Sequence, residues 1–169
     1  MMLLIYLFSA ICIIGLVLVG LGGLRLVGFM GMNHAIFAFM VSALFFFTET
    51  VVIFYFIGMG SNVKTYIQDN PGTDPEYRTK SNQIKREVYP ITLWLILAVM
   101  VTFIIGGGVE HGIISRWFHL AGWLAIVILF IKAIKAQHKA MRDQTILIWE
   151  IMGIDTESML SQNSPNEKD

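Results

Sequence analysis

Residues 2–24 read MLLIYLFSAICIIGLVLVGLGGL, a run without a single charged side chain. A helix needs roughly 20 apolar residues to cross a hydrocarbon core of about 30 Å, so this run is long enough to span a membrane. A secretory signal would begin with basic residues, and this chain has no early Lys or Arg. We therefore predict a retained first transmembrane helix over residues 2–24.

Three further apolar runs follow along the chain. Residues 33–57 carry one ionisable side chain, Glu49, and residues 118–134 form the last run. Residues 90–109 begin with Pro90, which suits a first helical turn because its missing N–H would have no partner there. The sequence thus predicts four transmembrane helices joined by polar segments.

The composition supports the same class of protein. Of the 169 residues, 56% are hydrophobic and 14% charged, and the mean hydropathy is +0.67. Those values exclude an ordinary soluble domain. The formal net charge of zero gives no reason to expect nucleic acid as a partner. The single cysteine, Cys12, leaves neither an intrachain disulfide nor a thiolate metal cluster.

The basic residues predict the orientation of the helices. Residues 59–89 hold five Lys and Arg side chains, whereas the two loops on the opposite side hold only Arg25 and Arg116. Basic loops stay on the cytoplasmic side during insertion. We expect both termini in the cytoplasm of a cell with a bacterial-type inner membrane.

The polar segments complete the predicted fold. Gly58 and Gly60 predict the end of the second helix, since glycine readily takes the conformation that stops a helix. Residues 59–89 then form a cytoplasmic loop, in which Asn-Pro-Gly at 70–72 is a strong turn signal.

The C-terminal part of the chain falls into two segments. Residues of about 139–154 are too short an apolar stretch to cross and predict a short interfacial helix, and residues 158–169 form a polar mobile tail. The expected fold is an all-α integral membrane protein: a four-transmembrane-helix up-and-down bundle over residues 1–157 with that interfacial C-terminal helix.

Three of the four histidines fall at the same membrane level in this topology. His34 opens the second span, His111 follows the third, and His119 opens the fourth. Imidazole is a common ligand of haem iron, and facing helices of a bundle can bring two of them together. His34 with His119, or His34 with His111, is a candidate clamp for a b-type haem. Small residues lie near the same level: Gly20, Gly22, Gly23, residues 106–108, Ala121 and Gly122.

Other interpretations of these residues stay open. Small residues also let membrane helices pack closely without any ligand, and His111 follows Glu110 in what reads as an exposed turn. The spacing Met30-x-Met32-x-His34 offers two thioethers and an imidazole, a ligand set that suits Cu(I).

Glu49 is a carboxyl group inside a predicted span, and such groups face protein, water or an opposite charge. Lys132 lies at a similar depth in the inner half and is a candidate partner. The helical phase opposes this pair, because at ~100° per residue Lys132 points ~140° away from His119. A haem clamp and a Glu49–Lys132 bridge therefore compete. Glu49 is either a proton-relay or quinone-site carboxyl, or a group hydrogen-bonded to Thr48, Thr50 or a neighbouring helix.

The leading functional hypothesis is a small integral subunit of a larger inner-membrane complex of the respiratory or electron-transfer class. It would hold a b-type haem or border a quinone near the outer face, and bind lipid and other membrane subunits. The layout is similar to that of several membrane b cytochromes, which is an analogy of architecture alone. A cofactor-free structural or assembly subunit is the alternative, and a small transporter or channel component is third. No nucleophile, base and orienting residue share one level, so the sequence does not predict an enzyme acting on its own.

Overall fold

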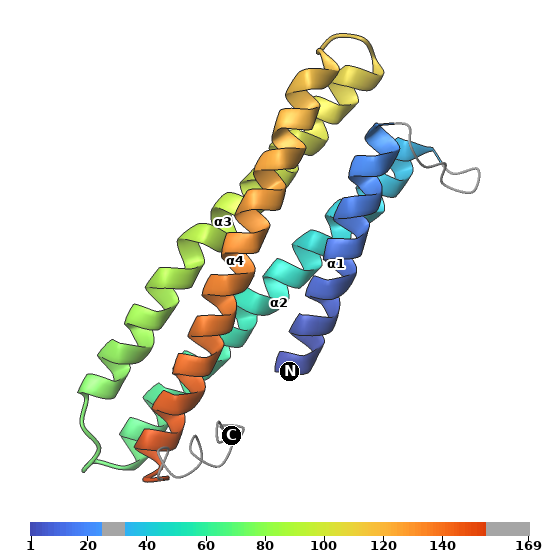
Figure 1. The fold of residues 1–169 in the computed structure, drawn as a ribbon. Helices are drawn as coiled ribbons and strands as arrows, with labels where there is room; N and C mark the ends of the chain where they lie inside the picture. Colours follow the sequence, from blue (N-terminus) through green and yellow to red (C-terminus); the bar gives the residue numbers. More distant parts are fainter. Residues whose placement is uncertain (25–32, 155–169) are drawn as a thin grey trace, which may run out of the picture.

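The computed structural model describes residues 1–24 and 33–154. These residues form four α-helices and no strand: α1 (Met2–Gly23), α2 (His34–Asp69), α3 (Glu76–Glu110) and α4 (Arg116–Ile151) (Figure 1). Each helix is long and apolar enough to cross a membrane. The prediction of four membrane-length helices is therefore confirmed.

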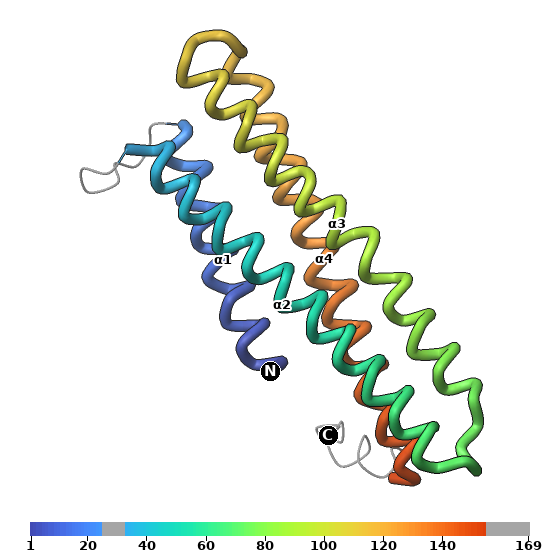
Figure 2. The backbone as a smooth tube through the Cα atoms, turned by 180° about the vertical axis from the view of Figure 1, so that it is seen from behind, coloured from blue at the N-terminus to red at the C-terminus, as the bar shows by residue number. Residues whose placement is uncertain are grey.

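Successive helices run in opposite directions, and both views of the backbone show the same up-and-down order (Figures 1 and 2). The short 111–115 connection lies at the end of the bundle that also holds His34, which we call the histidine end. The connection of residues 70–75 lies at the other end, which we call the hairpin end. The turn signal at 70–72 falls inside this connection.

Three helices are longer than the apolar runs that predicted them. α2, α3 and α4 contain 36, 35 and 36 residues. At ~1.5 Å per residue each is roughly 54 Å long, against about 30 Å for the hydrocarbon core of a membrane. α1, with 22 residues, has only membrane length and begins partway along its neighbours (Figure 1).

The extra length corrects two predicted helix ends. Gly58 and Gly60 do not end the second helix, which continues to Asp69. A Cβ atom at Gly60 would meet only the movable end of the Lys85 side chain, so this glycine neither stops the helix nor is required by a backbone contact. Likewise Pro90 lies inside α3 instead of in its first turn, because the polar residues before it are already helical.

The prediction of a separate interfacial helix over residues 139–154 is also wrong. α4 runs without a break from Arg116 to Ile151, so that segment is the last part of the fourth helix. The reason is that Ala140, Met141, Gln144 and Leu147 are buried at helical spacing against the other helices. The predicted tail, residues 158–169, lies outside the described residues.

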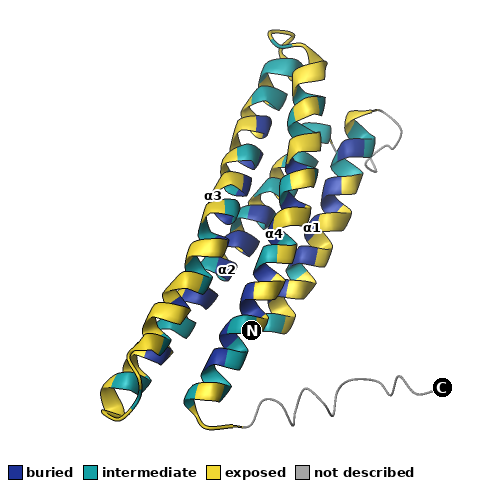
Figure 3. Cartoon of the chain, turned by 60° about the vertical axis from the view of Figure 1, so that its left-hand side comes forward, coloured by how far each residue is buried: buried dark blue, intermediate teal, exposed yellow. Residues whose placement is uncertain are grey.

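Two apolar clusters hold the helices together. One surrounds Phe45 and Phe130, whose ring centroids lie 4.6 Å apart across α2 and α4. The other surrounds Phe56 and includes Ile5 from the first turns of α1. Buried positions face neighbouring helices, while the outward faces are exposed and largely apolar, as lipid-facing surfaces are (Figure 3).

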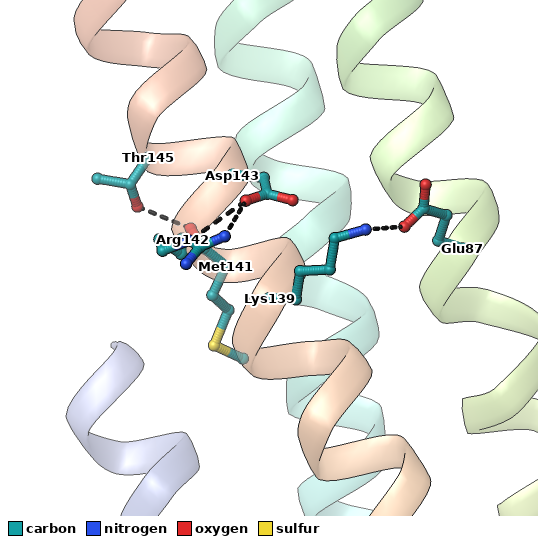
Figure 4. Close-up of polar contacts among 6 residues, drawn as sticks. All are labelled: Glu87, Lys139, Met141, Arg142, Asp143 and Thr145. Atoms are coloured by element: carbon teal, nitrogen blue, oxygen red, sulfur yellow. Dashed lines mark hydrogen bonds and ion pairs between the residues drawn. The ribbon is translucent and has the colours of Figure 1, made fainter. Parts of the chain in front are cut away.

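Beside and beyond the start of α1, the other three helices continue toward the 70–75 connection. We call residues 58–69, 76–87 and 139–151 the three-helix segment (Figure 1). Its interior pairs Ser81 with Gln144, whose Nε2 donates to Ser81 Oγ at 3.1 Å. On its surface, Lys139 Nζ lies 3.0 Å from Glu87 Oε2 and joins α4 to α3 (Figure 4). Polar side chains thus cover a packed interior in this part of the molecule.

Candidate functional site

The histidine end brings two imidazoles from different helices together. Asn33 caps α2, with its Oδ1 accepting a hydrogen bond from Ala35 N at 3.0 Å, and so fixes the helix start at His34. His119 lies in the first turn of α4. Their ring centroids are 6.4 Å apart and the ring planes are perpendicular.

The His119 ring is held by α3. Its Nδ1 lies 3.2 Å from the backbone oxygen of Thr102, so Nδ1–H donates to that carbonyl group and Nε2 is the available lone pair. The ring lies over Gly106, where an added Cβ atom would lie 2.9 Å from His119 Cε1. A backbone carbonyl that orients one ring nitrogen is the usual support of a metal-ligating histidine.

His34 and the third histidine are placed differently. The His34 ring lies against the end of α1, where a Cβ atom at Gly23 would be 3.7 Å from its Cε1. His111 is exposed at the C-cap of α3, beside Glu110, whose carboxylate accepts a hydrogen bond from Asn33 Nδ2 at 3.4 Å. The ring contact therefore favours His34 with His119 over His34 with His111.

The structure does not describe the candidate copper site of Met30, Met32 and His34, because Met30 and Met32 lie outside the described residues. Within residues 1–24 and 33–154, His, Cys, Asp and Glu side chains form no group of three or more that suits a metal ion. A bare zinc or copper ion takes three or four protein ligands as a rule, whereas a haem needs only axial ones.

The spacing of the two imidazoles fits two ligands of one metal. With metal–nitrogen bonds of ~2 Å, two imidazoles on opposite sides of one ion have centroids roughly 6 Å apart. The glycines beside them do not add a slot for a flat macrocycle. The His119 ring fills the space beside Gly106, and the Trp123 ring fills the space beside Gly20. The centroid distance thus matches that of two ligands of one metal, while these two small residues serve packing inside the chain.

Trp123 lies one turn after His119 on α4 and packs against α1. Its indole N–H donates to the backbone oxygen of Leu16 at 3.0 Å and ties α4 to α1. A Cβ atom at Gly20 would collide with the indole ring, so glycine is required for this approach.

A second polar site lies nearer the hairpin end. Glu49 is 1% exposed, and Gln137 Nε2 donates to its Oε2 at 2.7 Å. The same amide nitrogen lies 3.3 Å from Thr92 Oγ1, so the site joins α2, α3 and α4. Lys132 is exposed, and the Glu49 hydrogen bond goes to Gln137 instead.

Gln137 is the site residue that the sequence analysis missed. It lies 18 residues after His119, or five turns at ~3.6 residues per turn, and therefore on the same helix face. The helical phase that points Lys132 away from the bundle interior points Gln137 into it. Hydropathy does not indicate Gln137, because the apolar run of the fourth span stops at 134.

An apolar layer separates the two polar sites. Phe45 and Phe130 each lie 11 residues along their helices from His34 and His119, which places their contact ~16 Å below the histidine pair. Buried apolar side chains complete the layer: Leu16, Val99 and Ile126. The described residues thus form two polar sites with apolar packing between them.

No protein-family model matches the chain, and neither a curated protein nor a solved structure shows a significant similarity to it.

Proposed function

We propose that the chain is an integral subunit of a membrane electron-transfer assembly and that His34 and His119 hold a b-type haem. The observation that carries the proposal is the perpendicular ring pair at 6.4 Å, with His119 oriented by the Thr102 carbonyl. When bound, such a group supplies one-electron transfer. This chain would supply the two ligands, and the Thr102 carbonyl would fix the tautomer of one of them.

The placement in the membrane follows from the charges. The hairpin end carries most of the basic residues, so we place it in the cytoplasm, with the histidine pair at the outer face of a bacterial-type inner membrane. Partner subunits are supported by one feature: the three-helix segment extends past membrane length.

A reduced-minus-oxidised visible spectrum of the gently purified protein, with its accompanying subunits, tests the proposal. His34→Ala and His119→Ala should each remove the haem band. His111→Ala is the matched control: it removes an imidazole from the same end, but one outside the ring contact, and should leave the band intact. A band that survives all three changes would place the haem in a partner, and the absence of any band would overturn the proposal.

A cofactor-free structural subunit is the second candidate. It is favoured by the way Trp123 and His119 fill the spaces beside Gly20 and Gly106, because packing alone then accounts for those glycines. This candidate predicts a colourless protein that tolerates His34→Ala. A transporter is less well supported, since the layer around Phe45 and Phe130 interrupts any polar path between the two sites.

A further inference from the structure

Glu49 lacks the counter-charge that a buried carboxylate needs. The ion pairs among the described residues are Lys80–Glu76, Lys139–Glu87 and Arg142–Asp143. Glu49 belongs to none of them, although it is 1% exposed. Burying an unpaired charge is far more costly than burying a hydrogen-bonded neutral group. The surroundings of Glu49 therefore accommodate the neutral acid better than the carboxylate.

The two oxygens of this carboxyl group differ. Oε2 accepts the hydrogen bond from Gln137, while Oε1 has no hydrogen-bond partner among the described residues. The groups that face the site are neutral: α3 presents the Thr92 hydroxyl, α4 the Gln137 amide, and α1 the Cys12 thiol, which lies 3.5 Å from Thr48 Oγ1. One oxygen is thus fixed by the protein and the other is available to carry a proton.

The site lies between two apolar clusters. Toward the histidine end lies the apolar layer around Phe45 and Phe130. Toward the hairpin end lies the second cluster, which surrounds Phe56 and includes Ile5, Val52 and Val88. On the surface, Tyr6 Oη and His138 Nδ1 form an exposed hydrogen bond of 2.6 Å, and His138 directly follows Gln137 on α4. Glu49 lies 15 residues after His34, which places it ~22 Å along a span of about 30 Å and close to the hairpin-side boundary.

We propose that Glu49 is a proton-binding site, at which Oε1 carries one proton and the group is held as the neutral acid between the two apolar clusters. The Gln137 amide is a positioning group that holds Oε2 in both states. This inference does not depend on a haem at the other end, and its test is the same with or without one.

Infrared spectroscopy of the membrane-reconstituted full chain tests the inference. The wild type should show the C=O stretching band of a neutral carboxylic acid at neutral pH, and the band should disappear reversibly as the pH is raised. Glu49→Gln should lack the band. Glu87→Gln is the matched control, because it removes an exposed carboxylate that is paired with Lys139 and should leave the band unchanged.

A further readout tests the positioning role of Gln137. Gln137→Leu should shift the frequency of the band, because it removes the donor to Oε2. The proposal is overturned if the wild type shows no neutral-acid band, if the band never titrates, or if it persists in Glu49→Gln. The wild-type titration decides even where a variant fails to fold.

Discussion

At the scale of single residues, neighbouring glycines of α3 have unequal roles. A Cβ atom at Gly106 would lie 2.9 Å from His119 Cε1, whereas a Cβ atom at Gly107 would meet nothing within 4 Å. We expect Gly106→Ala to lower the free energy of unfolding by ~1–3 kcal/mol, as overpacking of a tight contact does. Thermal unfolding in detergent, followed by circular dichroism, measures the change.

Gly107→Ala is the control, because it makes the same chemical change one position along. Alanine is more favourable than glycine inside a helix by about 1 kcal/mol, and no contact opposes it there, so this variant should be as stable as the wild type or more so. Equal destabilisation by both changes would show that His119 does not occupy the space beside Gly106.

Some features of the two polar sites can be predicted from the sequence, and others cannot. The level of His34 and His119 follows from where the apolar runs begin, because polar residues at span ends lie near the membrane surface. The Thr102 carbonyl could not be foreseen, since a backbone acceptor has no sequence signature. Gln137 could have been found from helical phase alone, had the fourth helix been extended past its apolar run.

At the scale of elements, hydropathy marks where a helix can enter lipid but not where it ends. The polar residues after Gly60 continue α2, because Val63 there is buried at the same helical spacing as the residues before it. α4 likewise passes from apolar to mixed sequence at about 134 without a break. Its interior positions there alternate apolar side chains, such as Met141 and Leu147, with the amides Gln137 and Gln144, which lower the mean hydropathy.

The α3–α4 contact in the three-helix segment includes a buried polar pair. Ser81 and Gln144 are 1% and 0% exposed and hydrogen-bond to each other. Ser81→Ala should cost ~1–3 kcal/mol of unfolding free energy, because it leaves the Gln144 amide buried without its partner. Denaturant titration of the purified protein measures this cost.

The double variant Ser81→Ala/Gln144→Leu, compared with Ser81→Ala and Gln144→Leu alone, completes a double-mutant cycle. Replacing both partners by apolar groups removes the unsatisfied amide, so most of the lost stability should return. If the double variant is instead as unstable as the sum of the two single changes, the pair does not act as a unit and the segment is open to water.

At the scale of the whole molecule, the two polar sites lie toward opposite ends of one apolar bundle. The imidazole pair lies at the histidine end, and Glu49 lies nearer the hairpin end, with the Phe45–Phe130 layer between them. In the functions proposed for these sites, a haem at the imidazole pair and a proton at Glu49 would be bound independently, because the apolar layer separates them. The assignment of each site to a face of the membrane depends on the orientation of the whole chain.

That orientation can be measured with introduced cysteines, since the native Cys12 is 0% exposed and should stay unlabelled. Gly72 lies in the exposed hairpin connection and Ile113, 81% exposed, lies in the connection of the histidine end. With a membrane-impermeant maleimide on intact cells, Ile113→Cys should be labelled. Gly72→Cys should be labelled only after the membrane is permeabilised, because its flanking basic residues keep that loop inside.

The reverse pattern would refute the orientation and would move the Glu49 site to the outer half of the membrane. Labelling of both cysteines in intact cells would mean that the chain inserts in two directions, or that one helix pair does not cross. Neither result would alter the ring contact of His34 and His119, which depends on packing between helices and not on direction. The labelling experiment therefore tests the charge argument separately from the ligand argument, and it decides near which face of the membrane each site lies.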